Sequence, residues 1–188
     1  NTTGTNLVAV GANALDSNTT GNGNVAIGKE ALQTNTTASH NIAIGQGAMF
    51  FNTSGTRNTA VGANGTLTSN TSGNDNVAVG YVALAANTTG DNNTAVGKAA
   101  LDANTTGSTN TCLGVTALGA NTTGANNVAV GGSSLGSNTT ADDNTAVGTS
   151  ALFQNLTGAN NTAIGRTALF ANTTGANNVA VGANALDA

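Results

Sequence analysis

The chain repeats itself about every seventeen residues from end to end, and residues 121–131 (Asn-Thr-Thr-Gly-Ala-Asn-Asn-Val-Ala-Val-Gly) spell out the motif. A fixed short period is typical of solenoids, in which each repeat packs only on its neighbours. The fourth unit has eighteen residues, with the extra one around Asn64-Gly65, and no residue falls outside the array. The eleven units begin at Asn1, Asn18, Asn35, Asn52, Asn70, Asn87, Asn104, Asn121, Asn138, Asn155 and Asn172.

Positions 8 to 10 of the unit predict a short strand. Position 8 is always β-branched, position 9 is Ala except for Cys112, and position 11 is always Gly. Because side chains alternate along a strand, positions 8 and 10 share one face. We expect the aliphatic column at position 10 to form the core, at Val10, Ile27, Ile44, Val61, Val79, Val96, Leu113, Val130, Val147, Ile164 and Val181. The opposite Ala and Gly face is then small enough for chains to pack closely on it.

A second inward column is expected at position 15, within a second short strand centred on Ala-Leu. Its residues are Leu15, Leu32, Met49, Leu67, Leu84, Leu101, Leu118, Leu135, Leu152, Leu169 and Leu186. Stacked coils would also place identical amides above one another as hydrogen-bonded ladders. At position 7 this predicts a structural ladder of Asn24, Asn41, Asn58, Asn76, Asn93, Asn110, Asn127, Asn144, Asn161 and Asn178.

These patterns predict an all-β fold, a parallel β-solenoid of eleven coils with two short strands per coil. At about 4.8 Å per coil the rod is roughly 50 Å long. Units of this length are too short for a helix pair, and their Gly, Asn and Thr content disfavours helix. We expect residues 1–188 to be a single uncapped array, an excerpt of a longer fibre. The thin core of one coil favours a homo-oligomer.

Positions 1 to 3 spell Asn-x-Thr or Asn-x-Ser in all eleven units, Asn155-Leu156-Thr157 included. This is the acceptor pattern for N-glycans, which makes the eleven asparagines that begin the units candidate acceptors. The alternative is that Asn and Thr cap a tight turn by bonds to the backbone. A third hypothesis is an ice-binding array of Thr, with only one of the columns at positions 2 and 3 facing outward.

The core Asn-Val-Ala-Ile-Gly at residues 24–28 and Asn-Val-Ala-Val-Gly at residues 127–131 resembles the Asn-Ser-Val-Ala-Ile-Gly motif of trimeric autotransporter adhesin heads. The longer unit is also similar to repeats of phage tail fibres and bacterial surface fibres. The resemblance covers every unit, although Leu7 departs from it in the first. It implies a left-handed coil, a homotrimer and an extracellular location on a cell or virion surface.

Composition argues against most other functions. Only four basic residues are present (Lys29, Arg57, Lys98 and Arg166) and the net charge is −4, which disfavours nucleic-acid binding. No apolar run approaches the roughly 20 residues of a membrane span. His40 is the only histidine, the acidic residues scatter over variable positions, and Cys112 has no partner for a disulfide. We therefore expect neither an enzyme nor a metal or cofactor site.

The sequence thus predicts a structural and adhesive extracellular fibre segment, a rigid rod that presents repeated polar loops and holds terminal domains away from a surface. Such loops could bind glycans or a host surface weakly and at many points. The alternative is a self-assembling matrix or coat filament, with glycans on the Asn-x-Thr column. Ice binding is the minor alternative.

Overall fold

Each repeat unit forms one coil of a solenoid, and each coil contributes one strand of three residues. The computed structural model describes residues 1–187, so Ala188, the end of the predicted array, lies outside the described residues. The strands are β1 (Val8–Val10), β2 (Val25–Ile27), β3 (Ile42–Ile44), β4 (Thr59–Val61), β5 (Val77–Val79), β6 (Thr94–Val96), β7 (Thr111–Leu113), β8 (Val128–Val130), β9 (Thr145–Val147), β10 (Thr162–Ile164) and β11 (Val179–Val181).

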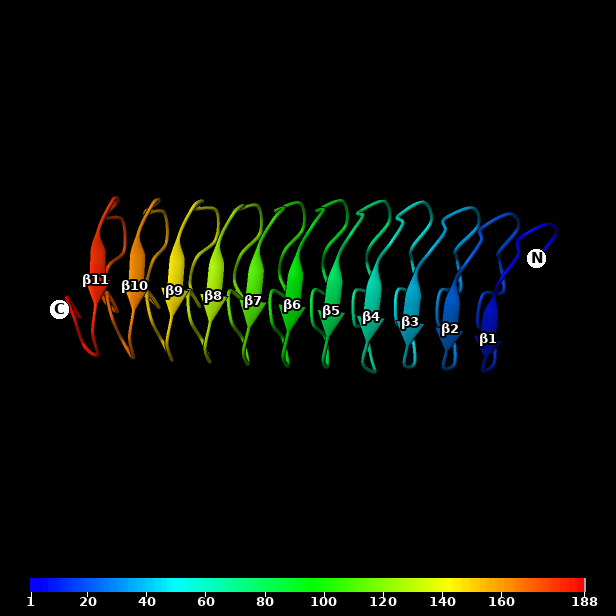
Figure 1. Cartoon of the computed structure of the whole chain (residues 1–188), viewed down its shortest axis with the longest axis horizontal. Coiled ribbons are helices and arrows are strands. Elements are labelled where there is room, and N and C mark those ends of the chain that lie inside the picture. Colours follow the sequence, from blue (N-terminus) through cyan, green and yellow to red (C-terminus); the bar gives the residue numbers. More distant parts are fainter. Residues whose placement is uncertain (188) are drawn as a thin grey trace.

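The eleven strands form one parallel sheet in which neighbours in sequence are neighbours in space (Figure 1). Every strand pairs with the next at the same repeat position, so that Val8 lies beside Val25 and Ala9 beside Ala26. The register survives the extra residue of the fourth coil, where Thr59 still pairs with Val77. Successive coils therefore stack in register along the rod, as the period predicts.

The core is built from three small or medium side chains per coil. The alanines at positions 9 and 14 and the leucine or methionine at position 15 are buried together along the rod, and Ala129, Ala117 and Leu118 are all 0% exposed. The column at position 15 thus lies in the core as expected, except that Leu186 in the last coil is 62% exposed.

The prediction that position 10 forms the core is wrong. Val10 is 56% exposed, Leu113 52% and Ile164 41%, whereas the alanines between positions 8 and 10 point inward. The physical reason is volume, because a seventeen-residue coil already holds a large side chain at position 15. The facing strand can then supply only a methyl group, and alternation turns positions 8 and 10 outward. The expected Ala and Gly packing surface for other chains is therefore internal.

The expected second strand at Ala-Leu is also absent from the part of the chain that the structure describes. Leu32 has φ 50 and Leu118 φ 52, in the left-handed region that a strand does not use. The segment is instead a pair of turns, in which the amide of Ala31 donates to Gly28 and that of Asn35 to Leu32. Position 15 still bonds to the next coil, since the Leu32 amide donates to Ala48 O at 3.1 Å.

Glycine at position 11 ends each strand for two reasons. Gly131 has φ 126, a conformation that a side chain disfavours. A Cβ at Gly131 would also lie 2.6 Å from the carbonyl carbon of Gly148 in the next coil. The invariant glycine column thus sets the close approach of successive coils at this corner.

Candidate functional site

The outer face of the sheet consists of positions 8 and 10 of every coil. Its side chains are Val, Ile, Leu and Thr throughout, and no charged residue occurs in either column. In the middle of the rod these side chains are partly exposed, and in several coils more than a third of the side chain is accessible, as for Ile42 at 38% and Ile44 at 36%. This uncharged strip, aliphatic at position 10 and divided between aliphatic residues and threonine at position 8, is therefore a candidate interaction surface.

The asparagines at position 1 lie inside the coil and form a continuous ladder. From the second coil onward, each amide Nδ2 donates to the Oδ1 of the asparagine one coil before it, as from Asn104 to Asn87 at 2.9 Å, and to the carbonyl of position 4, here Gly107 at 2.9 Å. Nine of the eleven are buried, namely Asn18, Asn35, Asn52, Asn70, Asn87, Asn104, Asn121, Asn138 and Asn155.

The glycan-acceptor interpretation is therefore contradicted at these nine sites. An acceptor needs a free, accessible Nδ2, whereas this atom is buried here and makes two hydrogen bonds to its own coil and the preceding one. The recurring Asn-x-Thr triplet is explained by turn capping, the alternative reading of the same pattern. Only Asn1 and Asn172, in the two terminal coils, are not buried.

The position 7 asparagines form a second internal ladder. The amide N–H of Asn110 donates to Oδ1 of Asn93 at 3.0 Å, and Nδ2 of Asn93 donates to the carbonyl of Gly107 at 2.9 Å. Among the described residues every buried side-chain nitrogen and oxygen has a hydrogen-bond partner. The two ladders thus satisfy the polar groups of a coil interior that has little room for apolar side chains.

The threonines at positions 2 and 3 lie at a turn on the surface. The position 2 hydroxyl donates to a backbone carbonyl in the next coil, as from Thr105 to Thr122 at 3.0 Å. Both Thr19 and Thr20 are exposed, as are Thr36 and Thr37, so the expectation that only one column faces outward is wrong. The reason is that these residues form a tight turn instead of an alternating strand.

The titratable residues do not converge on a site. In residues 1–187 no group of three or more His, Cys, Asp or Glu side chains could hold a metal ion. Cys112 occupies an alanine place in the core, and burial raises the pKa of its thiol. Arg57 and Asp75 form an exposed ion pair across two coils, with Nε to Oδ1 at 2.6 Å, and the arginine's hydrogen bond lowers the pKa of Asp75.

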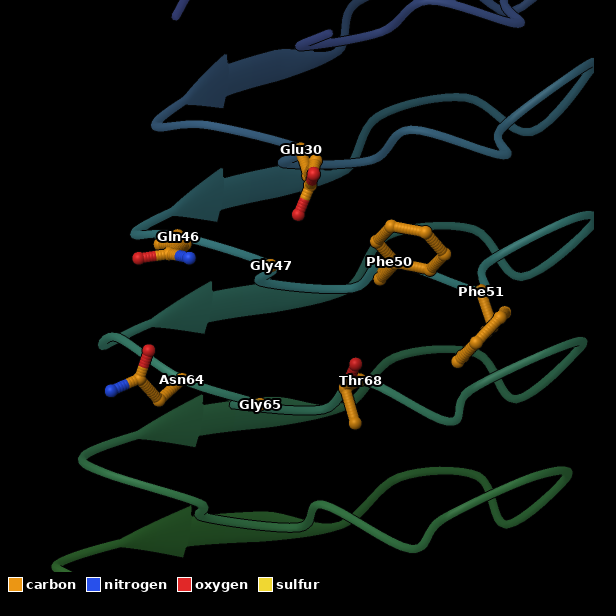
Figure 2. A pocket seen from close by; sticks show the side chains of 8 residues that line it. All are labelled: Glu30, Gln46, Gly47, Phe50, Phe51, Asn64, Gly65 and Thr68. Carbon is orange, nitrogen blue, oxygen red and sulfur yellow. The ribbon is translucent and has the colours of Figure 1, made fainter. Parts of the chain in front are cut away.

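One pocket interrupts the regular surface around the third and fourth coils (Figure 2). It encloses about 250 Å³ and is lined by Glu30, Gln46, Gly47, Phe50, Phe51, Asn64, Gly65 and Thr68. Sequence reasoning missed it, although two signals were present: the adjacent Phe50 and Phe51, and the extra residue at Asn64-Gly65. A second hollow lies at the end of the last coil, against Leu169, Asn172 and Leu186.

Comparison with protein-family models, with curated proteins and with solved structures finds no match to this chain. In the part of the chain that the structure describes, no helix has the length and apolar character needed to cross a bilayer.

Proposed function

We propose that this chain is a segment of an extracellular structural fibre in which three copies pack side by side through the outer face of the sheet. The observation that carries the proposal is the uncharged strip at positions 8 and 10, which is aliphatic at every position 10 and at six of the eleven positions 8. It lies on a coil whose buried polar side-chain groups are all hydrogen-bonded. Residues such as Val130 and Ile164 contribute nothing to the core of their own chain, so burial against a second copy accounts for their apolar character.

Three copies suit the shape of this strip. It is only two side chains wide, so around a threefold axis the position 8 column can face one neighbour and the position 10 column the other. A second copy is also the partner best matched in length and repeat, because its coils have the same spacing along the rod. The absence of charge from both columns means that no like charges meet in such an assembly.

The fibre role follows from rigidity and repetition. Every coil bonds to the next through the sheet, both asparagine ladders and the turns, which makes a stiff spacer of roughly 50 Å. Such a rod would hold terminal domains away from a cell or virion surface, and its repeated polar loops could add weak adhesion along its length. This role requires no catalysis, and the resemblance to adhesin heads and tail-fibre repeats also supports it.

The test is native mass measured by light scattering at micromolar concentration. We expect a species three times the 18.0 kDa of one chain. The double variant Val96→Lys and Val130→Lys places two charges on the strip and should give single chains with unchanged circular dichroism. Thr123→Lys, on the exposed turn, adds a charge elsewhere and should leave the mass unchanged.

Two results would overturn the proposal. A wild-type chain that is folded and monomeric at this concentration would remove the assembly. A mass that rises without limit as concentration increases would favour the matrix or coat filament instead of a closed trimer.

A further inference from the structure

We propose that the pocket beside Phe50 and Phe51 binds a hexopyranose ring, the unit of a glycan. The pocket lies on the segment that follows the strands, and Figure 2 shows the strands behind it. The core alanines and leucines separate this segment from the sheet, so an assembly through the outer face leaves the pocket open. Its combination of Phe51 with the extra residue at Gly65 occurs once in the sequence, unlike the repeated loops.

The walls combine aromatic faces with hydrogen-bonding groups. The Phe50 and Phe51 rings meet edge to face, with centroids 4.6 Å apart, and Phe51 is 52% exposed. An aromatic face carries negative charge density and attracts the polarised C–H bonds on one side of a pyranose. Gln46 and Asn64 offer amide donors and acceptors, and Glu30, which pairs with Lys29 at 3.3 Å, offers a carboxylate for hydroxyl groups.

The size of the pocket favours one sugar ring. Its volume of about 250 Å³ falls just below the roughly 300–1,000 Å³ of pockets for drug-sized ligands. Shallow sites with polar rims and few aromatic contacts bind single sugars weakly, on the order of millimolar. A negatively charged ligand is disfavoured because Glu30 is the only charged residue among those that line the pocket.

Gly47 leaves space at the pocket because it has no side chain, although the backbone conformation at this position does not require glycine. Its φ is 64, yet Glu30, Ala99 and Ser133 adopt φ 61, 52 and 56 at the same repeat position in other coils. A Cβ at Gly47 would meet no atom within 4 Å, so a side chain there projects into open space at the pocket. Gly65, at the extra residue of the fourth coil and with φ 97, lines the pocket from that neighbouring coil.

This arrangement supplies two variants with a matched control. Gly47→Asn introduces a residue that the same position carries at Asn13 and Asn184, so it should fold while filling the pocket. Phe51→Ala removes an exposed aromatic wall. Phe153→Ala is the control, because Phe153 stacks on Phe170 at 5.5 Å in a part of the rod remote from the pocket.

The experiment is saturation-transfer NMR with methyl β-glucopyranoside, methyl β-galactopyranoside and N-acetylglucosamine, each at millimolar concentration. We expect transfer to the ring protons of at least one sugar, reduced about fivefold or more in Gly47→Asn and Phe51→Ala and unchanged in Phe153→Ala. The disaccharide of the sugar that binds then separates the two sources: tighter binding identifies a glycan chain, and weaker binding a free monosaccharide.

Three results would overturn the inference: no transfer to any of the sugars, equal transfer in all variants, or binding of p-cresol without binding of any sugar. The last would identify a merely apolar hollow. Native mass measured on the same samples keeps the outcome separate from that of the proposed assembly, since the pocket lies within one chain.

Discussion

The inner and outer faces of the same sheet use side chains in opposite ways. Inside the coil lie alanines, two ladders of hydrogen-bonded asparagines, and one leucine or methionine per coil. Outside stand valine, isoleucine and threonine, without a partner in the single chain. In a globular domain the larger apolar residues would be the buried ones. The inversion teaches that a narrow coil is held together by fitted small groups and polar ladders, while its larger apolar residues remain available for assembly.

The largest effect should come from breaking a ladder. Asn93→Ala removes the acceptor of the Asn110 amide and the donor to the Gly107 carbonyl, both inside the coil. The Gly107 carbonyl still accepts from Asn104 Nδ2, so only the Asn110 amide is left unpaired, at a cost of about 1–3 kcal/mol. With about 0.5–1.5 kcal/mol for the other hydrogen bond that is lost, the free energy of unfolding should fall by about 2–4 kcal/mol. Urea denaturation measures this loss. Thr123→Ala, on the exposed turn, should change it by less than about 0.5 kcal/mol, and equal losses in both variants would refute the role of the ladder.

Two adjacent residues of β7 allow the chemical accessibility of the inner and outer faces to be compared. Cys112 is 0% exposed and its pKa is raised by burial, whereas Leu113 is 52% exposed. In the double variant Cys112→Ala and Leu113→Cys, made in the Val96→Lys and Val130→Lys background so that assembly does not cover the outer face, the thiol should react with a disulfide reagent at an ordinary rate. The natural Cys112 should react more slowly by roughly a hundredfold or more, since an opening free energy of about 3 kcal/mol gives that ratio. Comparable rates would place Cys112 outside the core.

The same comparison can be made by changing volume. Ala129→Leu adds carbon atoms to an interior that Leu118 and Leu135 already fill, and should destabilise the chain by about 1–3 kcal/mol. Val130→Ala, one residue later, removes two methyl groups from the outer face and should leave the stability of the single coil nearly unchanged while weakening assembly. Thermal unfolding and native mass distinguish the two effects. A larger loss of monomer stability for Val130→Ala would reverse the assignment of the faces.

The sequence predicts the solenoid, the coil boundaries and the register, because those depend only on the period. It does not predict which face of the strand is internal, since Val and Ile at position 10 are individually more apolar than Ala129 or Ala163. The informative signal was size: position 9 never exceeds alanine or Cys112, whereas position 10 accepts Val, Ile and Leu. A column restricted to small residues indicates a volume limit, and a varied one indicates free space.

The pocket could not be predicted from the period, because it arises where the period fails. Gly65 lies beside the Phe50-Phe51 pair of the preceding coil only after the coils are stacked. The Asn-x-Thr triplet illustrates a different error. It follows the period and matches a glycan-acceptor motif, but its asparagine is buried in the ladder once the coils stack. Local sequence patterns predict where the chain turns. They do not predict whether a side chain is accessible, because this depends on the side of the coil that it faces.

The smallest effects should come from Asp75 and Asp102, two carboxyl groups whose pKa values are shifted in opposite directions. The hydrogen bond from Arg57 lowers the pKa of Asp75 below its ordinary 3.8. Its stabilising contribution is therefore present above pH 4 and lost as the pH falls through the folded-state pKa.

Desolvation raises the pKa of Asp102 above 3.8. The ionised form of Asp102 therefore destabilises the folded state, increasingly as the pH rises through the range between 3.8 and its folded-state pKa. At pH 7 Asp75→Asn should slightly lower the thermal midpoint and Asp102→Asn slightly raise it, and each difference should disappear as the pH falls below the folded-state pKa of that carboxyl group. Because Asp75 is exposed, its effect should also shrink in 1 M salt. Shifts of the same sign in both variants would contradict the assignment of their environments.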